Sequence, residues 1–136
     1  MTRYAFLFCC LLLLVLATAT CGSSRQLQTV TLNPAVADAR NFPNGQVSFA
    51  ATGAFSKPPS PVPLTSKDVM WCVGASDGTC AGNINTGATV DSNGVAQCLP
   101  GPARTVTILA GRGKASMNPD GSAQLTVFGA AQLTCP

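Results

Sequence analysis

The sequence contains no histidine and no glutamate, and charged residues make up only 10% of its 136 residues. Without histidine the chain cannot build a Ser-His-Asp triad, a Cys-His nucleophile pair or a zinc site with histidine ligands. Its five acidic residues are all aspartates, which leaves few carboxylates for acid–base chemistry. We therefore expect a protein that is not an enzyme and needs no metal or other cofactor. A small hydrolase or redox protein using Asp, Ser or Cys is the alternative.

The positive charge of the chain is small and scattered. Eight Lys and Arg residues against five Asp give a net charge of +3. The chain lacks the concentrated basic face that is typical of nucleic-acid-binding proteins, so we expect no nucleic-acid partner. Arg112 and Lys114 form a small basic cluster that we expect to be solvated surface, with contact to anionic headgroups or polysaccharide as the alternative.

The first twenty residues have the pattern of a secretory signal peptide. Arg3 supplies a positive start, and the apolar run 5–19 is shorter than the roughly 20 residues that a membrane-spanning helix needs. Ordinary signal peptidase can cut after Ala19, between small residues. Alternatively, Cys21 with the following Gly-Ser-Ser resembles a bacterial lipoprotein signal, in which this cysteine becomes the lipidated first residue. An uncleaved N-terminal anchor is the remaining alternative.

These features divide the chain into three parts. We expect a signal peptide at 1–20, a short polar tether at 21–26 and one folded domain at 27–136. The expected location is the cell envelope, with a lipid anchor on Cys21 favoured over a secreted or periplasmic form.

The seven cysteines divide in the same way. Cys9 and Cys10 leave with the signal peptide, and Cys21 stands at the cleavage boundary. The folded domain keeps four: Cys72, Cys80, Cys98 and Cys135. An exported chain meets an oxidising compartment, where an even set of cysteines usually pairs, and four cysteines allow three connectivities. The short loop between Cys72 and Cys80 favours their local pairing, which leaves Cys98–Cys135 as a long-range disulfide. The chain has no Cys-x-x-Cys motif for a redox or zinc site.

The body of the chain consists of short runs rich in Val, Thr and aromatic residues, separated by turn residues. The runs lie at 27–32, 45–51, 68–73, 89–91, 94–98, 105–110, 123–128 and 131–135. No window has a helical stripe with start and stop signals. This pattern predicts an all-β fold, an antiparallel sandwich of about seven short strands held by disulfides. We expect the Pro-rich segment 57–63 to be a stiff surface connection, with a polyproline ligand as the alternative.

Five fragments in a fixed order resemble a bacterial immunoglobulin-like domain of group 2, the module of intimin- and invasin-type surface proteins. The fragments are 30–34, 45–53, 64–71, 88–95 and 105–108, and the resemblance covers 27–111. It implies an Ig-like sandwich with a structural, adhesion or interaction role at the envelope, and a protein or glycan as the unidentified partner. The alternative is a secreted ligand-binding or inhibitor domain that uses the Cys72–Cys80 loop. The four body cysteines, the Pro-rich insertion and the tail beyond 111 depart from the family pattern.

Trp71 is the single tryptophan and alternates in phase with Val69 and Val73. This position predicts a core aromatic of the sandwich, with an exposed platform for stacking a carbohydrate as the alternative. We expect segment 91–94, Asp-Ser-Asn-Gly, to be a hairpin turn, because it lacks the further acidic ligands that a calcium loop needs.

Intact-mass analysis of the mature protein from membranes tests the processing. We expect a chain that begins at Cys21 and carries a diacylglyceryl-sized increment, and a gain of about four hydrogens on reduction of two disulfides. A chain that begins at Thr20 without lipid would rule out the lipid anchor.

Overall fold

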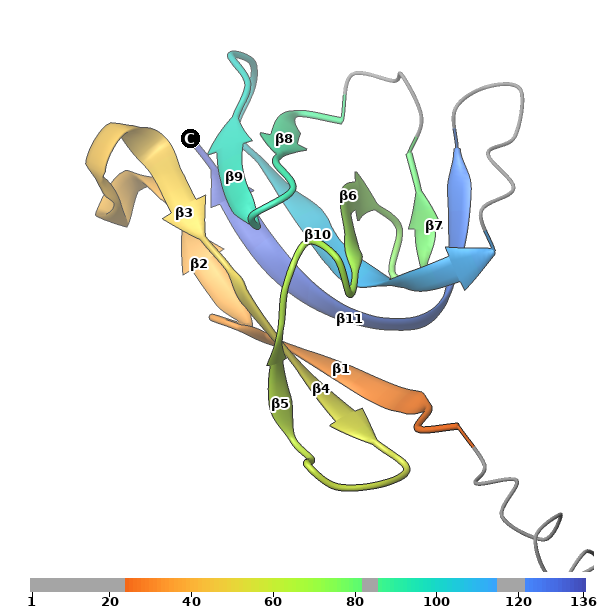
Figure 1. The fold of residues 1–136 in the computed structure, drawn as a ribbon. Coiled ribbons are helices and arrows are strands. Elements are labelled where there is room, and N and C mark those ends of the chain that lie inside the picture. Colours follow the sequence, from red (N-terminus) through yellow and green to blue (C-terminus); the bar gives the residue numbers. More distant parts are fainter. Residues whose placement is uncertain (1–23, 82–85, 115–121) are drawn as a thin grey trace, which may run out of the picture.

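The computed structural model describes residues 24–81, 86–114 and 122–136, and it is built almost entirely of strands (Figure 1). These segments contain β1 (Leu27–Asn33), β2 (Val36–Asp38), β3 (Gln46–Ser48), β4 (Ala50–Phe55), β5 (Val62–Leu64), β6 (Met70–Gly74), β7 (Thr79–Cys80), β8 (Ala88–Val90), β9 (Val95–Cys98), β10 (Arg104–Lys114) and β11 (Ala123–Cys135). Two single-turn 3-10 helices, η1 (Ala39–Asn41) and η2 (Pro43–Gly45), connect β2 to β3. The prediction of an all-β fold is confirmed.

The signal peptide, Cys21 and the expected turn at 117–121 lie outside the described residues. Within the part of the chain that the structure describes, no helix has the length and apolar character needed to cross a membrane.

Two small sheets are connected by the consecutive strands β3 and β4. In one, β4 lies between β1 and β5, and both neighbours are antiparallel to it. In the other, β9 lies between β3 and β8, again antiparallel. Only Phe49 separates β3 from β4, so one length of chain joins the two sheets (Figure 1).

The remaining sheet is organised by the long antiparallel pair β10–β11, whose register runs from Arg104 opposite Cys135 to Lys114 opposite Gln124. β6 pairs along the other side of β10, and β2 pairs in parallel with β11. The two-residue strand β7 pairs with both β6 and β11. The expected runs 123–128 and 131–135 therefore form one continuous strand, β11, that pairs along β10.

The core lies between these sheets. One buried apolar cluster takes side chains from β1, β3, β10 and β11, with Val47, Ile108 and Leu133 fully enclosed. A second, smaller cluster forms around Leu109 and Leu125 and includes the buried Cys80. Alternate residues of these strands are buried, as the period-two pattern of the sequence predicts.

Three strands are absent from the expectations drawn from the sequence: β2, β5 and β7. The prolines of 57–63 favoured a surface connection, yet its end forms β5, with Pro63 opposite Thr52. A proline is tolerated there because β5 is an edge strand. Strands β2 and β7 have three and two residues, which is too short for an alternating pattern to identify them.

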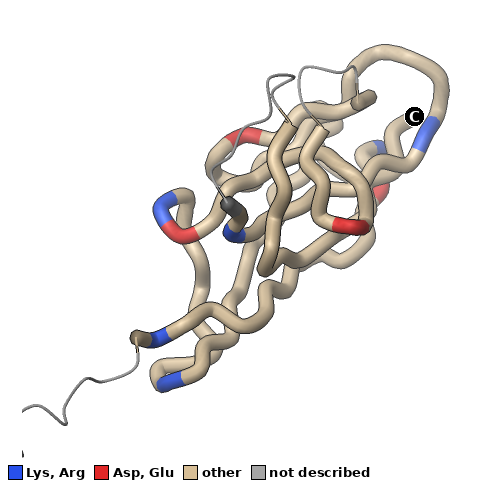
Figure 2. Tube along the Cα trace, turned by 90° about the vertical axis from the view of Figure 1, so that its right-hand side faces the viewer, with Lys and Arg blue, Asp and Glu red and all other residues tan. Residues whose placement is uncertain are grey.

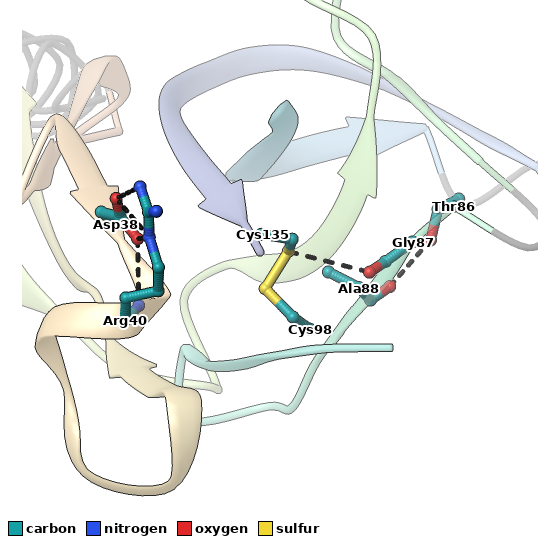
Figure 3. Close-up of a disulfide and its surroundings, with 7 residues drawn as sticks. All are labelled: Asp38, Arg40, Thr86, Gly87, Ala88, Cys98 and Cys135. Atoms are coloured by element: carbon teal, nitrogen blue, oxygen red, sulfur yellow. Dashed lines mark hydrogen bonds and ion pairs between the residues drawn. A yellow bond between two sulfur atoms is a disulfide. The ribbon is translucent and has the colours of Figure 1, made fainter. Parts of the chain in front are cut away.

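Both predicted disulfides are present. Cys72–Cys80 links β6 to β7 within one sheet, and Cys98–Cys135 links β9 to the end of β11, joining two sheets (Figure 3). The Cα atoms of each pair lie 5.6 Å apart. The sulfur of Cys135 lies 3.8 Å from the carbonyl oxygen of Gly87, which places this disulfide against the segment that enters β8.

Removal of each disulfide should destabilise the domain to a different extent. The cysteines are 37 positions apart in Cys98–Cys135 and 8 apart in Cys72–Cys80, so loop-closure entropy gives losses of about 3.8 and about 2.5 kcal/mol. Urea unfolding of the paired Cys→Ala variants measures both values. A larger loss from the Cys72–Cys80 pair would contradict the chain-entropy explanation and assign the effect to packing in the smaller cluster.

Candidate functional site

A groove with a volume of about 740 Å³ opens beside the beginning of β6. Its walls come from residues 66–71 before and within β6, from 90–92 at the β8–β9 turn, and from 111–113 near the end of β10. These segments are distant in the sequence, and the pairing of Met70 with Gly111 brings two of them together. The groove is therefore a product of strand register.

Trp71 lies at the boundary between the groove and the core. It is partly buried, packs against the main apolar cluster and also lines the groove. Ala110 stands opposite it on β10. One part of the side chain therefore contacts the core, as the core-aromatic interpretation predicts. Another part lines the groove, as the stacking-surface alternative requires.

The β8–β9 turn holds the indole in place. Gly94 has a φ of +81°, and a Cβ atom there would lie 2.5 Å from the carbonyl oxygen of Phe49 and 2.7 Å from Cζ2 of Trp71. The backbone N–H of Phe49 donates to the carbonyl oxygen of Gly94 over 2.9 Å. Only glycine permits this close approach of the turn to the indole edge.

Asp91 fixes the conformation of the same turn. Its Oδ1 accepts hydrogen bonds from the backbone N–H groups of Asn93 and Val95, each over 2.8 Å. The N–H of Gly94 donates to the carbonyl oxygen of Asp91 over 3.1 Å. The hairpin turn predicted for 91–94 is present, and its aspartate lines the groove.

Arg112 and Asp68 form another part of the groove lining. Nε of Arg112 donates to the carbonyl oxygen of Asp68 over 2.7 Å, and its Nη2 lies 3.6 Å from Oδ1 of the same residue. Oδ2 of Asp68 accepts from the backbone N–H and the hydroxyl of Thr65 over 2.9 and 2.8 Å. These two hydrogen bonds, the backbone one foremost, hold the pKa of Asp68 below its usual value. The carboxylate is therefore ionised at neutral pH.

A β-bulge in β11 lies opposite the end of β10, next to the residues of β10 that line the groove. The register with β11 shifts between Arg112 and Gly113, whose partners are Val127 and Leu125, so Thr126 is the extra residue. The Thr126 hydroxyl donates to the carbonyl oxygen of Arg112 over 3.2 Å. Bulges bend a strand and re-aim its side chains, and they occur often beside functional sites.

The groove carries a balanced set of charges. Lys67 and Arg112 bring two positive charges, and Asp68 and Asp91 bring two negative ones. Over the molecule, too, basic and acidic residues are spread along the trace (Figure 2). The Arg112 side chain, expected as part of a solvated basic cluster, is 49% exposed and also pairs with Asp68; the side chain of Lys114 lies outside the described residues.

The Cys72–Cys80 loop, the other candidate binding element, is attached to β11. The N–H of Leu125 donates to the carbonyl oxygen of Gly78 over 2.9 Å, and the Thr79 hydroxyl donates to Oε1 of Gln124 over 2.9 Å. Nε2 of Gln124 donates to the carbonyl oxygen of Asp77 over 3.1 Å. These contacts hold the loop against the sheet.

Sequence reasoning singled out Trp71, Asp91 and Arg112 but did not place them together, and it missed the other residues of the groove, Asp68 among them. Asp68 and Arg112 are 44 positions apart, and nothing in their spacing pairs them. One signal could have found this contact. If the runs 68–73 and 105–110 are paired as neighbouring strands and the second run is extended by two residues, Asp68 and Arg112 come together. Among the described residues, no group of three or more Cys or Asp side chains is arranged to hold a metal ion.

No protein-family model matches the chain, and a search of curated proteins finds no match to it either.

Substitution of Gly94 tests how the turn positions Trp71. Gly94→Ala places a methyl group against Phe49 and the indole, so we expect a loss of about 1–3 kcal/mol in unfolding free energy beyond that of a matched control. The control is Gly45→Ala, which also has a positive φ, +66°, but has no atom within 4 Å of the new methyl group.

Urea unfolding measures the stabilities, and the emission of the single tryptophan reports its surroundings. The emission maximum should shift in Gly94→Ala and remain unchanged in Gly45→Ala. Equal stabilities and identical spectra for the two variants would contradict the positioning role of the turn.

Proposed function

We propose that the chain is an exported, lipid-anchored, Ig-like domain that acts without catalysis as a recognition module at the bacterial cell envelope. The observation that carries this proposal is the strand order. Along one side of the core the order is β1, β3–β4, β9 and β8, and along the other it is β6, β10 and β11. Seven-stranded immunoglobulin-type sandwiches have this order of four and three strands.

Two further features support an Ig-like interpretation. Trp71 stands on β6, the third main strand, where immunoglobulin domains carry their central tryptophan. The Cys98–Cys135 disulfide joins β9 to β11 and thus crosses between the two groups of strands, as a stapling bond of a sandwich does. β2, β5 and β7 are additions to this plan.

The start of the folded domain supports a short anchor. The guanidinium carbon of Arg25 lies 3.7 Å from the centre of the Phe55 ring, and its Nε donates to the carbonyl oxygen of Lys57 over 3.1 Å. With a lipid on Cys21, at most four residue steps, about 14 Å, separate the acylated residue from Arg25. Such a tether keeps the domain at the membrane surface.

The chemistry of the groove supports a non-catalytic role. The Oδ1 atom of Asp91 is engaged in its turn, and the pKa of Asp68 is held below its usual value. A general acid or base at neutral pH needs a pKa near 7, and the chain has no histidine to provide it. Recognition requires only a stable surface, which these same interactions supply.

Cell fractionation of the full chain and of Cys21→Ala tests the proposed location. We expect the unaltered protein in the membrane fraction, resistant to carbonate washing and released by detergent, because acyl chains bind a bilayer through their buried methylenes. Cys21→Ala should move to the soluble fraction. Cys9→Ala, within the signal peptide, is the matched control and should remain with the membrane.

Recovery of the unaltered protein in the soluble fraction or the medium would contradict the anchor. That result would favour the secreted ligand-binding or inhibitor domain, in which the Cys72–Cys80 loop contacts the partner.

A further inference from the structure

We propose that the groove beside β6 binds a neutral saccharide chain, with Trp71 as its apolar contact and Asp91 and Arg112 as its polar contacts. This inference rests on the proposed recognition function and names its ligand class. Four properties of the groove carry it: a fixed indole, a division between acceptors and donors, a balanced charge, and size.

The indole of Trp71 is fixed before any ligand arrives. Its edge is held against Gly94, and its inner part packs on the main core. Met70, next to it on β6, is 39% exposed and also lines the groove. A pyranose ring has an apolar face of C–H groups, which matches a flat aromatic surface held in one orientation. A rigid contact of this kind loses little conformational entropy on binding.

The polar groups of the groove separate into acceptors and donors. Asp91 uses Oδ1 for its two backbone hydrogen bonds, and among the described residues its Oδ2 has no hydrogen-bond partner. The Arg112 side chain is 49% exposed; within 24–81, 86–114 and 122–136 its Nε makes a short hydrogen bond, and its Nη2 lies 3.6 Å from Oδ1 of Asp68. A carboxylate only accepts and a guanidinium only donates, so a ligand that contacts both must do both. Sugar hydroxyl groups have this dual capacity.

The charge balance selects against ionic ligands. Among the described residues, the four charged side chains that line the groove sum to zero, so this lining carries no net charge that favours an anionic or a cationic ligand. A phosphate-bearing or polyacidic ligand would face Asp68 and Asp91, and a polybasic one would face Lys67 and Arg112. A neutral, hydroxyl-rich ligand satisfies these groups without bringing a charge of its own.

The dimensions of the groove agree with a short saccharide. Its volume of about 740 Å³ lies within the range of sites that hold small ligands, roughly 300–1,000 Å³. The β8–β9 turn at 90–92 and residues 111–113 near the end of β10 both line the groove.

Fluorescence titration of Trp71 provides a direct test, because it is the single tryptophan of the chain. The mature protein, held in a detergent without a sugar headgroup, is titrated with chitotetraose, cellotetraose and maltotetraose, and with tetragalacturonate as an anionic comparison. We expect a saturable change in emission with at least one neutral tetrasaccharide and none with tetragalacturonate.

Arg112→Met should weaken binding of that tetrasaccharide about tenfold or more, because it removes hydrogen bonds from a charged donor. Arg40→Met is the matched control. Arg40 does not line this groove, and its Nη2 lies 2.6 Å from Oδ2 of Asp38, so its loss should leave the affinity unchanged. Trp71→Phe keeps most of the apolar volume, and we expect calorimetry to show weaker binding. This variant also tests the proposal if Arg112→Met fails to fold.

Three outcomes would overturn the proposal: no response to any neutral tetrasaccharide at millimolar concentration, binding of tetragalacturonate alone, or equal affinities for Arg112→Met and Arg40→Met. None of them bears on the lipid anchor, which the fractionation of Cys21→Ala tests separately. The domain can therefore prove to be an anchored module whose partner is not a saccharide, and the two failures are distinguishable.

Discussion

The antiparallel ladder between β10 and β11 is the interaction on which the rest of the structure depends. β6 pairs with β10, β2 pairs with β11, and β7 connects β6 to β11. Both strands also contribute fully buried side chains to the core, among them Ile108 and Leu133. A ladder of this length, with one shift in register, pairs the backbone polar groups of two strands along most of their length, as a buried sheet requires.

The small size of the buried side chains explains why disulfides are useful to this domain. Its core contains many small side chains: Ala37, Ala39, Ala51, Ala88, Ala96, Ala110, Ala123 and Ala131 are all buried. Each alanine removes little apolar area from water, so hydrophobic burial contributes less per residue than in a core of Leu and Phe. Cys98–Cys135 fastens the end of β11 to β9, and Cys72–Cys80 fastens β6 to β7. Covalent links thus reinforce the strands that flank the ladder.

The features that sequence predicts are those encoded locally. Val69, Trp71 and Val73 alternate, which identifies β6, and the short loop between Cys72 and Cys80 makes their pairing local. The Asp-Ser-Asn-Gly segment at 91–94 identifies its turn, because aspartate caps the loop and glycine takes the positive φ. Each of these signals lies within ten residues of chain.

The groove could not be predicted in the same way. Its polar wall requires Asp68 and Arg112 to meet, and this depends on the register of β6 against β10 and on a bulge whose extra residue, Thr126, is on β11. Register is set by which faces of three strands pack on the core, a property of the whole fold. β5 was missed for a related reason, since only its place at a sheet edge makes Pro63 acceptable.

Trp71 connects stability to the proposed recognition. The indole packs on the core and is held by Gly94, and it also forms part of the groove surface. A side chain that must satisfy both environments cannot move far in response to a ligand, because displacement would open space in a closely packed region. The groove is thus pre-formed by the same contacts that stabilise β6, β9 and β10. In a small domain with an alanine-rich core, a binding surface supported by the core requires no additional loop to be ordered when the ligand arrives.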